Sequence, residues 1–193
     1  MALIDLTYFV GPLNIPNTTE LQEVANEVNW YINKYEPEFL QKALGYPLYK
    51  AYQADKENQR FKDIIEGAEY TDIYGNIAKW PGLIQEVKPA IPAGDNTPAS
   101  PAQKVSVIAN YVYYWRQRSN TTQSTGIGEV RPDGDNSQTV SPRQKMISSL
   151  NEIHYKVKEL VAFLEAKQDV YTEWTYIDKV NALRTFGFIN PIF

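Results

Sequence analysis

Cysteine is absent from this chain of 193 residues, and histidine occurs once, at His154. The absence of cysteine excludes disulfide bonds, thiolate metal sites and cysteine nucleophiles. One histidine cannot form a two-histidine metal site, and the residues near it have no spacing typical of a catalytic triad. We therefore expect His154 to have a packing or surface role, and the sequence predicts no catalytic, cofactor or metal site.

Long hydrophobic runs and an excess of positive charge are also absent. The net charge of -4 and the isoelectric point near 5.1 argue against a surface built to wrap nucleic acid. The segment Met1–Gly11 has no basic start and no apolar run of the length that a signal peptide or a membrane span requires. We expect a protein that is made in the cytosol and does not bind membranes.

Aromatic residues, in contrast, are abundant, at 13% of the chain with 14 tyrosines. Tyrosine joins a large apolar face to a polar tip and, with Trp and Arg, is favoured at protein interfaces. The composition therefore favours a protein that makes contacts with other proteins.

Helical periodicity and capping residues indicate a long helix in the first quarter of the chain. It is predicted to start at Thr19 and to kink or restart at the Glu36–Pro37 step. Gly45 is expected to end it, and Pro47 to open a short helix through Tyr52.

Two further helix starts share nearly the same five residues, SPAQK from Ser100 and SPRQK from Ser141. Each offers Ser as the N-cap, Pro at the first helical position and Gln three residues after the cap. The helix from Ser141 is predicted to run to about Val170 with one narrow apolar stripe.

The helix that follows Ser100 has no continuous polar face, which is unusual for a helix at a protein surface. One side is predicted to pack in the core of the subunit, namely Val105, Ile108, Ala109 and Val112. The opposite side is predicted to meet a neighbouring subunit or loop, namely Tyr111, Tyr114 and Arg118.

Turn residues mark the connections between these helices. The segment Glu69–Leu83, with Gly75-Asn76 between two strand-like runs, predicts a β-hairpin, and the Pro-rich residues 87–100 predict a stiff surface loop. The polar loop 119–140 is longer than most ordered connections. Its Gly-x-Gly lacks the Lys-Ser or Lys-Thr of a phosphate loop. Because the loop is polar throughout and can bury little by itself, we expect any order that it has to come from a neighbour.

The predicted fold is one mainly α domain over residues 1–193. It is a helical bundle with a small β-hairpin, the long polar loop 119–140 and an extended C-terminal arm, residues 171–193. The arm is aromatic to its last residue, whereas free chain ends are usually polar. We expect its last segment, Arg184–Phe193, to dock on another protein, and the alternative is that this segment covers the core of its own subunit.

The predicted interface residues come from the apolar helix, the polar loop and the C-terminal arm. They are Tyr111, Tyr114, Trp115, Arg116, Arg118, Thr125, Ile127, Phe186, Phe188, Ile189 and Phe193. The two arginines also suit the negative end of the helix dipole. Contact with acidic groups of a partner or with DNA phosphate is the alternative interpretation for them.

Four stretches of the sequence resemble small virion proteins of tailed bacteriophages and prophages, especially crAss-like phages of gut Bacteroidetes. The stretches are YFVGPLNIPN, INKYEPEFLQKALGYPLY, KWPGL and IANYVYYWRQRSNTTQSTGIGEV. The chain is similar to their head-to-tail connector proteins, also called adaptor, head-completion or ring proteins, from about Leu3 to Leu164.

This resemblance implies a helical structural subunit of the virion neck, assembled in the cytoplasm of the host bacterium. It implies a ring of about twelve copies that contacts the portal protein and other connector or tail proteins. DNA would pass through the lumen without sequence-specific binding. The alternatives are a carboxylate-dependent virion hydrolase, which needs two carboxylates in one cleft, and a helical adaptor that forms no ring.

Overall fold

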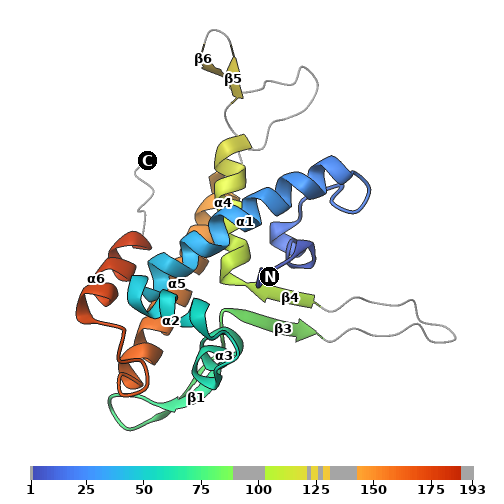
Figure 1. Ribbon diagram of the computed structural model, residues 1–193. Coiled ribbons are helices and arrows are strands. Elements are labelled where there is room, and N and C mark those ends of the chain that lie inside the picture. Colours follow the sequence, from blue (N-terminus) through green and yellow to red (C-terminus); the bar gives the residue numbers. More distant parts are fainter. Residues whose placement is uncertain (1, 89–102, 121–122, 126–127, 131–142, 188–193) are drawn as a thin grey trace, which may run out of the picture.

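The computed structural model describes residues 2–88, 103–120, 123–125, 128–130 and 143–187. Helices make up most of it, and short antiparallel strand pairs complete it (Figure 1). This arrangement confirms the predicted mainly α class, a helical bundle with a small hairpin. No helix in the described part of the chain is both long and apolar enough to cross a membrane.

The first long helix, α1 (Gln22–Leu44), continues through Pro37 as one element. The predicted kink or restart is therefore wrong. Proline cannot donate the hydrogen bond that the Asn33 carbonyl would accept, but both residues are exposed, so the carbonyl lies on the solvent side. On the opposite side Val28 and Phe39, from either half of the helix, are fully buried, and this shared packing keeps the helix in one piece.

Gly45 ends α1 with a φ of 73°, as predicted. The predicted short helix is α2 (Tyr46–Ala54), and it has Pro47 in its first turn. After a turn, α3 (Gln59–Glu66) starts at Asn58, whose side chain accepts a hydrogen bond from the backbone N–H of Arg60.

The predicted hairpin is also present: β1 (Ala68–Thr71) pairs with β2 (Ile77–Trp80). Trp80 anchors its base, because the side chain is 1% exposed and its Nε1 donates to the carbonyl of Ile64 at 2.9 Å. The turn at the other end of the hairpin projects from the lower end of the molecule in Figure 1.

A second strand pair occupies a region where the sequence predicted a loop and then a helix. The strand β3 (Ile84–Lys88) pairs with β4 (Gln103–Ser106), so the predicted helix start at Ser100 is wrong. The cap is Ser106: its Oγ accepts a hydrogen bond from the N–H of Ile108 at 3.1 Å and donates to the carbonyl of Leu83 at 2.8 Å. The residue that starts the helix therefore also ties it to Leu83, just before the start of β3.

The apolar helix, α4 (Val107–Asn120), packs between α1 and α5 (Arg143–Ala166), as Figure 1 shows. Ile108, Ala109 and Val112 are fully buried, as predicted, whereas Val105 lies in β4 and is 41% exposed. The helix needs no polar face because helices of the same chain cover it on two sides.

Beyond α4, the strand β5 (Gln123–Thr125) pairs with β6 (Gly128–Val130). This pair lies inside the segment that was predicted as a polar loop. The predicted cap of α5 at Ser141 lies outside the described residues, and the helix ends at Ala166, before the expected Val170.

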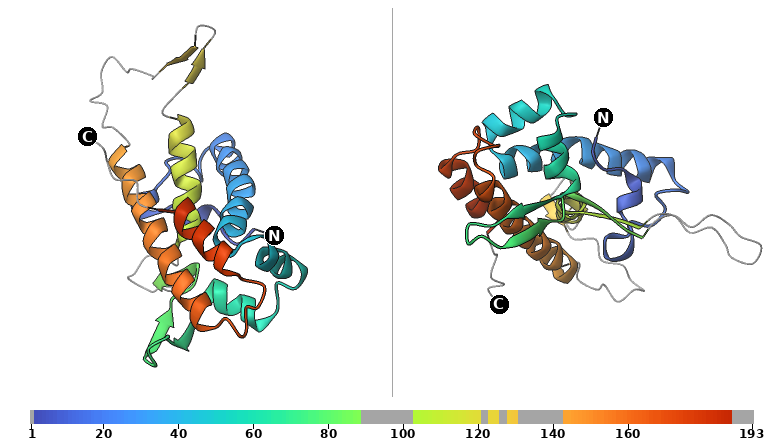
Figure 2. Two further views of the ribbon diagram at one scale, coloured as in Figure 1. Left: turned by 90° about the vertical axis from the view of Figure 1, so that its left-hand side faces the viewer. Right: turned by 90° about the horizontal axis from the view of Figure 1, so that it is seen from below.

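The chain after α5 forms a turn and then α6 (Tyr176–Thr185), which packs against α1 and α5 (Figure 2). The prediction of an extended arm from residue 171 is therefore wrong for residues 171–187. Thr175 and Asp178 form a capping box, in which each side chain bonds to the backbone N–H of the other residue. This local signal outweighs the interrupted apolar pattern that suggested an extended arm.

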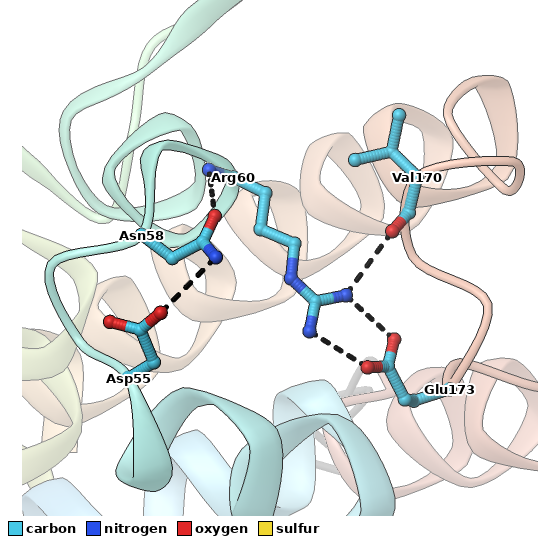
Figure 3. A network of polar contacts seen from close by, with 5 residues as sticks. All are labelled: Asp55, Asn58, Arg60, Val170 and Glu173. Carbon is cyan, nitrogen blue, oxygen red and sulfur yellow. Dashed lines mark hydrogen bonds and ion pairs between the residues drawn. The ribbon is translucent and has the colours of Figure 1, made fainter.

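Two polar contacts fix the outer segments to the bundle. At the N-terminus, which includes the 3-10 helices η1 (Leu6–Tyr8) and η2 (Gly11–Leu13), Glu36 accepts hydrogen bonds from the backbone of residues 3 and 4. Near the C-terminus, Arg60 of α3 makes a two-point ion pair with Glu173 at 2.7 and 2.8 Å and donates to the carbonyl of Val170 (Figure 3). The ion pair holds α3 against the turn before α6.

Candidate functional site

A pocket beside the second half of α4 contains several of the predicted interface residues. Its volume is about 170 Å³, and it lies between α4, α5 and the end of α6. We call it the α4 pocket; its lining includes Tyr111, Tyr114, Trp115, Arg118 and Phe186. The structure thus brings residues from the apolar helix and from the C-terminal segment together, although more than sixty positions separate them in the sequence.

Tyr111 forms the inner wall of the α4 pocket and is only 5% exposed. Its ring packs against Phe39 and Phe186, with centroid distances of 5.5 and 5.9 Å. Its hydroxyl donates to Glu38 at 2.9 Å and accepts from Lys42 at 3.3 Å, and burial raises the pKa of Tyr111. The prediction that Tyr111 points outward to a neighbouring subunit is therefore wrong, because α1 covers this side of α4.

Tyr114, Trp115 and Arg118 form the accessible rim of the α4 pocket. Trp115 is half-buried and stacks on Tyr35 of α1 at 5.2 Å, with 3° between the ring planes. Tyr114 meets the Trp115 ring edge-on at 5.5 Å, and the exposed guanidinium of Arg118 lies 5.0 Å from the centre of that ring. Tyr, Trp and Arg are the residue types that dominate binding energy at protein interfaces.

Arg116 points away from this rim. Its side chain is 13% exposed, and its Nη2 lies 3.1 Å from Glu27 Oε2. Asn120 also donates to Glu27, at 3.4 Å. Arg116 therefore joins α4 to α1 within the subunit, and it does not contribute to the accessible rim that was predicted to contain it.

Phe186 is 7% exposed and belongs to the core of its own subunit. Its carbonyl oxygen lies 2.8 Å from Nδ1 of His154, which is itself 8% exposed. The prediction of a docking role for Phe186 is therefore wrong. Of the two roles expected for His154, packing or surface, its burial indicates packing. Phe186 anchors the end of α6 in the bundle.

The other predicted interface residues cannot be assigned to this site. Thr125 is the last residue of β5. Ile127, Phe188, Ile189 and Phe193 lie outside the described residues.

An exposed apolar surface that the sequence analysis missed lies at the turn between β1 and β2. Ile73, Tyr74 and Ile77 of that hairpin are 72%, 83% and 84% exposed. Together with Asp72 they form what we call the hairpin tip. Two large apolar residues inside a turn were visible in the sequence as a signal, because turn positions are normally polar.

A second exposed apolar surface lies on α6. Tyr176, Ile177 and Val180 are 74%, 69% and 42% exposed, and Arg184, one turn further along, is exposed as well. We call these four residues the α6 face. This face was not predicted from the sequence because α6 itself was not predicted, although the Thr175 capping box could have revealed the helix.

Glu36 is the only carboxylate that is buried among the described residues. It lines a cavity of about 230 Å³ with Tyr52 and Lys56. Burial raises its pKa, although the hydrogen bonds from the N–H groups of Leu3 and Ile4 partly oppose this shift. Within the described part of the chain, no three His, Asp or Glu residues come together in a way that could hold a metal ion.

Comparisons with known proteins give no assignment for this site. No family model matches the chain, and no significant similarity was found to a curated protein or to a solved structure.

Proposed function

We propose that the chain is a structural subunit of a ring in the neck of a tailed bacteriophage, between the portal protein and the tail. The sequence resemblance to head-to-tail connector proteins suggests this role. The arrangement of exposed apolar surface on the subunit supports it.

The observation that carries the proposal is the presence of two different apolar surfaces at separate places, the hairpin tip and the α6 face. Identical subunits close a ring through heterologous contacts, in which one surface of each copy meets another surface of the next. A subunit of such a ring therefore needs two separate contact surfaces. Tyr74 lies in the first of these surfaces and Ile177 in the second, and both side chains are more than two-thirds exposed.

The rim of the α4 pocket suits a contact with another protein of the neck. Tyr114, Trp115 and Arg118 lie there side by side, and Arg118 contributes a positive charge beside an aromatic pair. In this proposal the portal protein or a tail protein binds at the rim. The net charge of -4 is consistent with a lumen through which DNA passes without being held.

The hydrolase alternative gains no support from Glu36, because both of its carboxylate oxygens accept hydrogen bonds from the backbone of Leu3 and Ile4. A catalytic carboxylate must be able to reach a substrate or a water.

The remaining alternative, a helical adaptor without a ring, differs from our proposal in its oligomeric state.

Native mass spectrometry of the purified chain tests the proposal. We expect one closed oligomer of defined mass, together with ring-shaped particles in electron micrographs. A chain that stays monomeric at every concentration, or that forms only dimers, contradicts the ring. Binding of the assembled ring to a purified portal protein then tests its place in the neck, and Arg118→Ala, a change at an exposed position of the rim, should weaken that binding while the ring mass stays unchanged.

A further inference from the structure

We propose that the hairpin tip of one copy docks on the α6 face of the neighbouring copy, an inference that rests on the proposed ring. The contact would be heterologous, because the hairpin tip and the α6 face are different surfaces. Repetition of the same contact around a symmetry axis can close a ring.

The hairpin tip is held in one conformation by hydrogen bonds within its turn. Asp72 Oδ1 accepts from the backbone N–H groups of Tyr74 at 2.9 Å and of Asn76 at 2.8 Å. The N–H of Asp72 donates to the carbonyl of Asn76 at 2.8 Å, and Gly75 supplies the positive φ of 87° that the turn requires. A surface that is already ordered loses little conformational entropy when it binds.

The α6 face is held by the bundle on its opposite side. Ala182 and Phe186 are buried there, and Lys179 forms an ion pair with Glu165 of α5. The buried side of α6 therefore fixes the helix, while Ile177 and Val180 on its outer side remain exposed.

The two surfaces match in apolar character and in charge. Each consists of one tyrosine and two β-branched aliphatic residues, which gives apolar area on both sides of the contact. The hairpin tip also contains the Asp72 carboxylate, whose pKa is lowered by the hydrogen bonds from Asn76, so it stays negative. The α6 face contains Arg184, which is exposed and lies one turn beyond Val180. Opposite charges beside an apolar contact favour this pairing over contact of each surface with its own copy.

The geometry of the subunit directs the contact to another copy. The base of the hairpin is fixed by Trp80 and by Tyr70, whose rings pack on Phe163 of α5 at 6.0 and 5.4 Å. The hairpin tip lies at the lower end of the molecule, whereas α6 covers its left-hand side in Figure 1. With the hairpin base and α6 both packed on the bundle, a second chain is the natural partner for each surface.

Cysteine cross-linking tests this pairing, and the chain suits the method because it contains no cysteine. We would prepare Tyr74→Cys and Ile177→Cys as separate proteins, mix them under mild oxidation and analyse the products on a non-reducing gel. We expect a disulfide-linked dimer in the mixture and none with either protein alone. A chain carrying both substitutions should give a ladder of linked oligomers that reducing agent collapses to monomers.

The matched control replaces Ile177→Cys with Asn29→Cys, which is also exposed but lies on α1. This control should not cross-link with Tyr74→Cys. Cross-links within either single-cysteine protein would mean that each surface pairs with its own copy, which overturns the inference.

Native mass spectrometry of the same proteins separates the two proposals. Rings of full mass without the Tyr74–Ile177 cross-link would overturn the docking inference and leave the ring proposal standing. The cross-link in a protein that forms only open chains would support the docking inference and overturn the closed ring. A protein that stays monomeric throughout would overturn both.

Discussion

Tyr111 and Tyr74 are the same kind of side chain in opposite surroundings. Tyr111 is 5% exposed and packs between α4 and α1, whereas Tyr74 is 83% exposed at the hairpin tip. From the sequence alone, Tyr111 was predicted to lie at an interface, and Tyr74 was not singled out. The difference shows that an aromatic-rich composition serves two purposes here, a core built from rings and a small amount of apolar surface outside it.

The core around Tyr111 explains why so many aromatic residues occur in a small domain. Tyr35, Phe39, Trp115 and Phe186 all pack against its ring, at centroid distances between 5.5 and 6.2 Å. Three separate elements therefore meet through one cluster of rings. Aromatic pairs at these distances add stabilisation beyond the burial of their area.

Phe39→Ala should show the largest effect of the changes considered, because Phe39 is fully buried in that cluster. We expect a loss of about 3–5 kcal/mol in the free energy of unfolding, from lost burial and from the cavity left behind. Urea denaturation measures it. Tyr176→Ala, which removes a ring that is 74% exposed, is the control and should change stability by less than about 0.5 kcal/mol. Similar losses for both variants would remove the distinction between core and surface rings.

Glu36→Ala extends the comparison to carboxylates, since Asp72 is only half-buried while Glu36 is 6% exposed. The N–H groups of Leu3 and Ile4 would lose their acceptor. We expect a loss of about 2 kcal/mol in the free energy of unfolding and faster hydrogen exchange at both amides. Unchanged exchange at these amides would show that Glu36 does not hold the N-terminal segment.

The raised pKa of Glu36 gives a pH dependence with a definite sign. Burial favours the neutral acid, so the stability that this group contributes is fully present below its usual pKa of 4.5 and is lost as pH rises through the raised value. Glu36→Gln keeps an uncharged side chain at every pH. The wild-type protein should therefore become less stable relative to Glu36→Gln as pH rises above 4.5.

Arg60→Lys tests a contact of intermediate exposure, because the side chains of Arg60 and Glu173 are 24% and 30% exposed. Lysine cannot reproduce the two-point ion pair of the guanidinium (Figure 3). We expect a loss of about 1 kcal/mol in the free energy of unfolding near neutral pH, a modest value because solvent screens the pair.

The pH dependence of this ion pair has the opposite sign to that of Glu36. The hydrogen bonds from Arg60 lower the pKa of Glu173, so its stabilising contribution is present above the usual value of 4.5 and is lost as pH falls through the lowered value. The difference in the free energy of unfolding between the wild-type protein and Arg60→Lys should therefore shrink as pH falls below 4.5 and Glu173 becomes protonated. A difference that stays constant in acid would show that the ion pair does not cause it.

Much of the fold could be predicted from local signals in the sequence. Gly45, Pro47 and the Gly75-Asn76 turn act through backbone conformation alone, and the elements that they delimit were predicted correctly. The start of α4 was predicted wrongly, because SPAQK contains every local capping signal but pairing with β3 makes Gln103–Ser106 a strand. Such pairing between distant segments cannot be read from a capping motif.

The candidate site was harder to predict because exposure depends on the neighbours of a residue. Nothing in the sequence around Tyr111 shows that α1 covers it. The apolar turn residues Ile73 and Tyr74 were a usable signal, since a hairpin was predicted there and a turn rarely contributes to a core. A predicted turn that contains large apolar residues identifies exposed apolar surface better than the aromatic content of the chain does.

Tyr74→Ser should have the smallest effect on folding and a clear effect on assembly. Its ring lies in solvent, so we expect a change of less than about 0.5 kcal/mol in the free energy of unfolding. Loss of an interfacial tyrosine commonly costs about 2 kcal/mol of binding. The contact between subunits should therefore weaken about 30-fold, because each 1.4 kcal/mol corresponds to a factor of about ten.

Tyr155→Ser, at a position on α5 that is 54% exposed, is the matched control for Tyr74→Ser and should leave both the free energy of unfolding and the contact between subunits unchanged. If Tyr74→Ser unfolded the subunit, the hairpin tip would belong to the folded core, and the contrast with Tyr111 would not hold. If it left both folding and assembly intact, the hairpin tip would be exposed without serving as a contact, and only the role of Tyr111 in the core would stand.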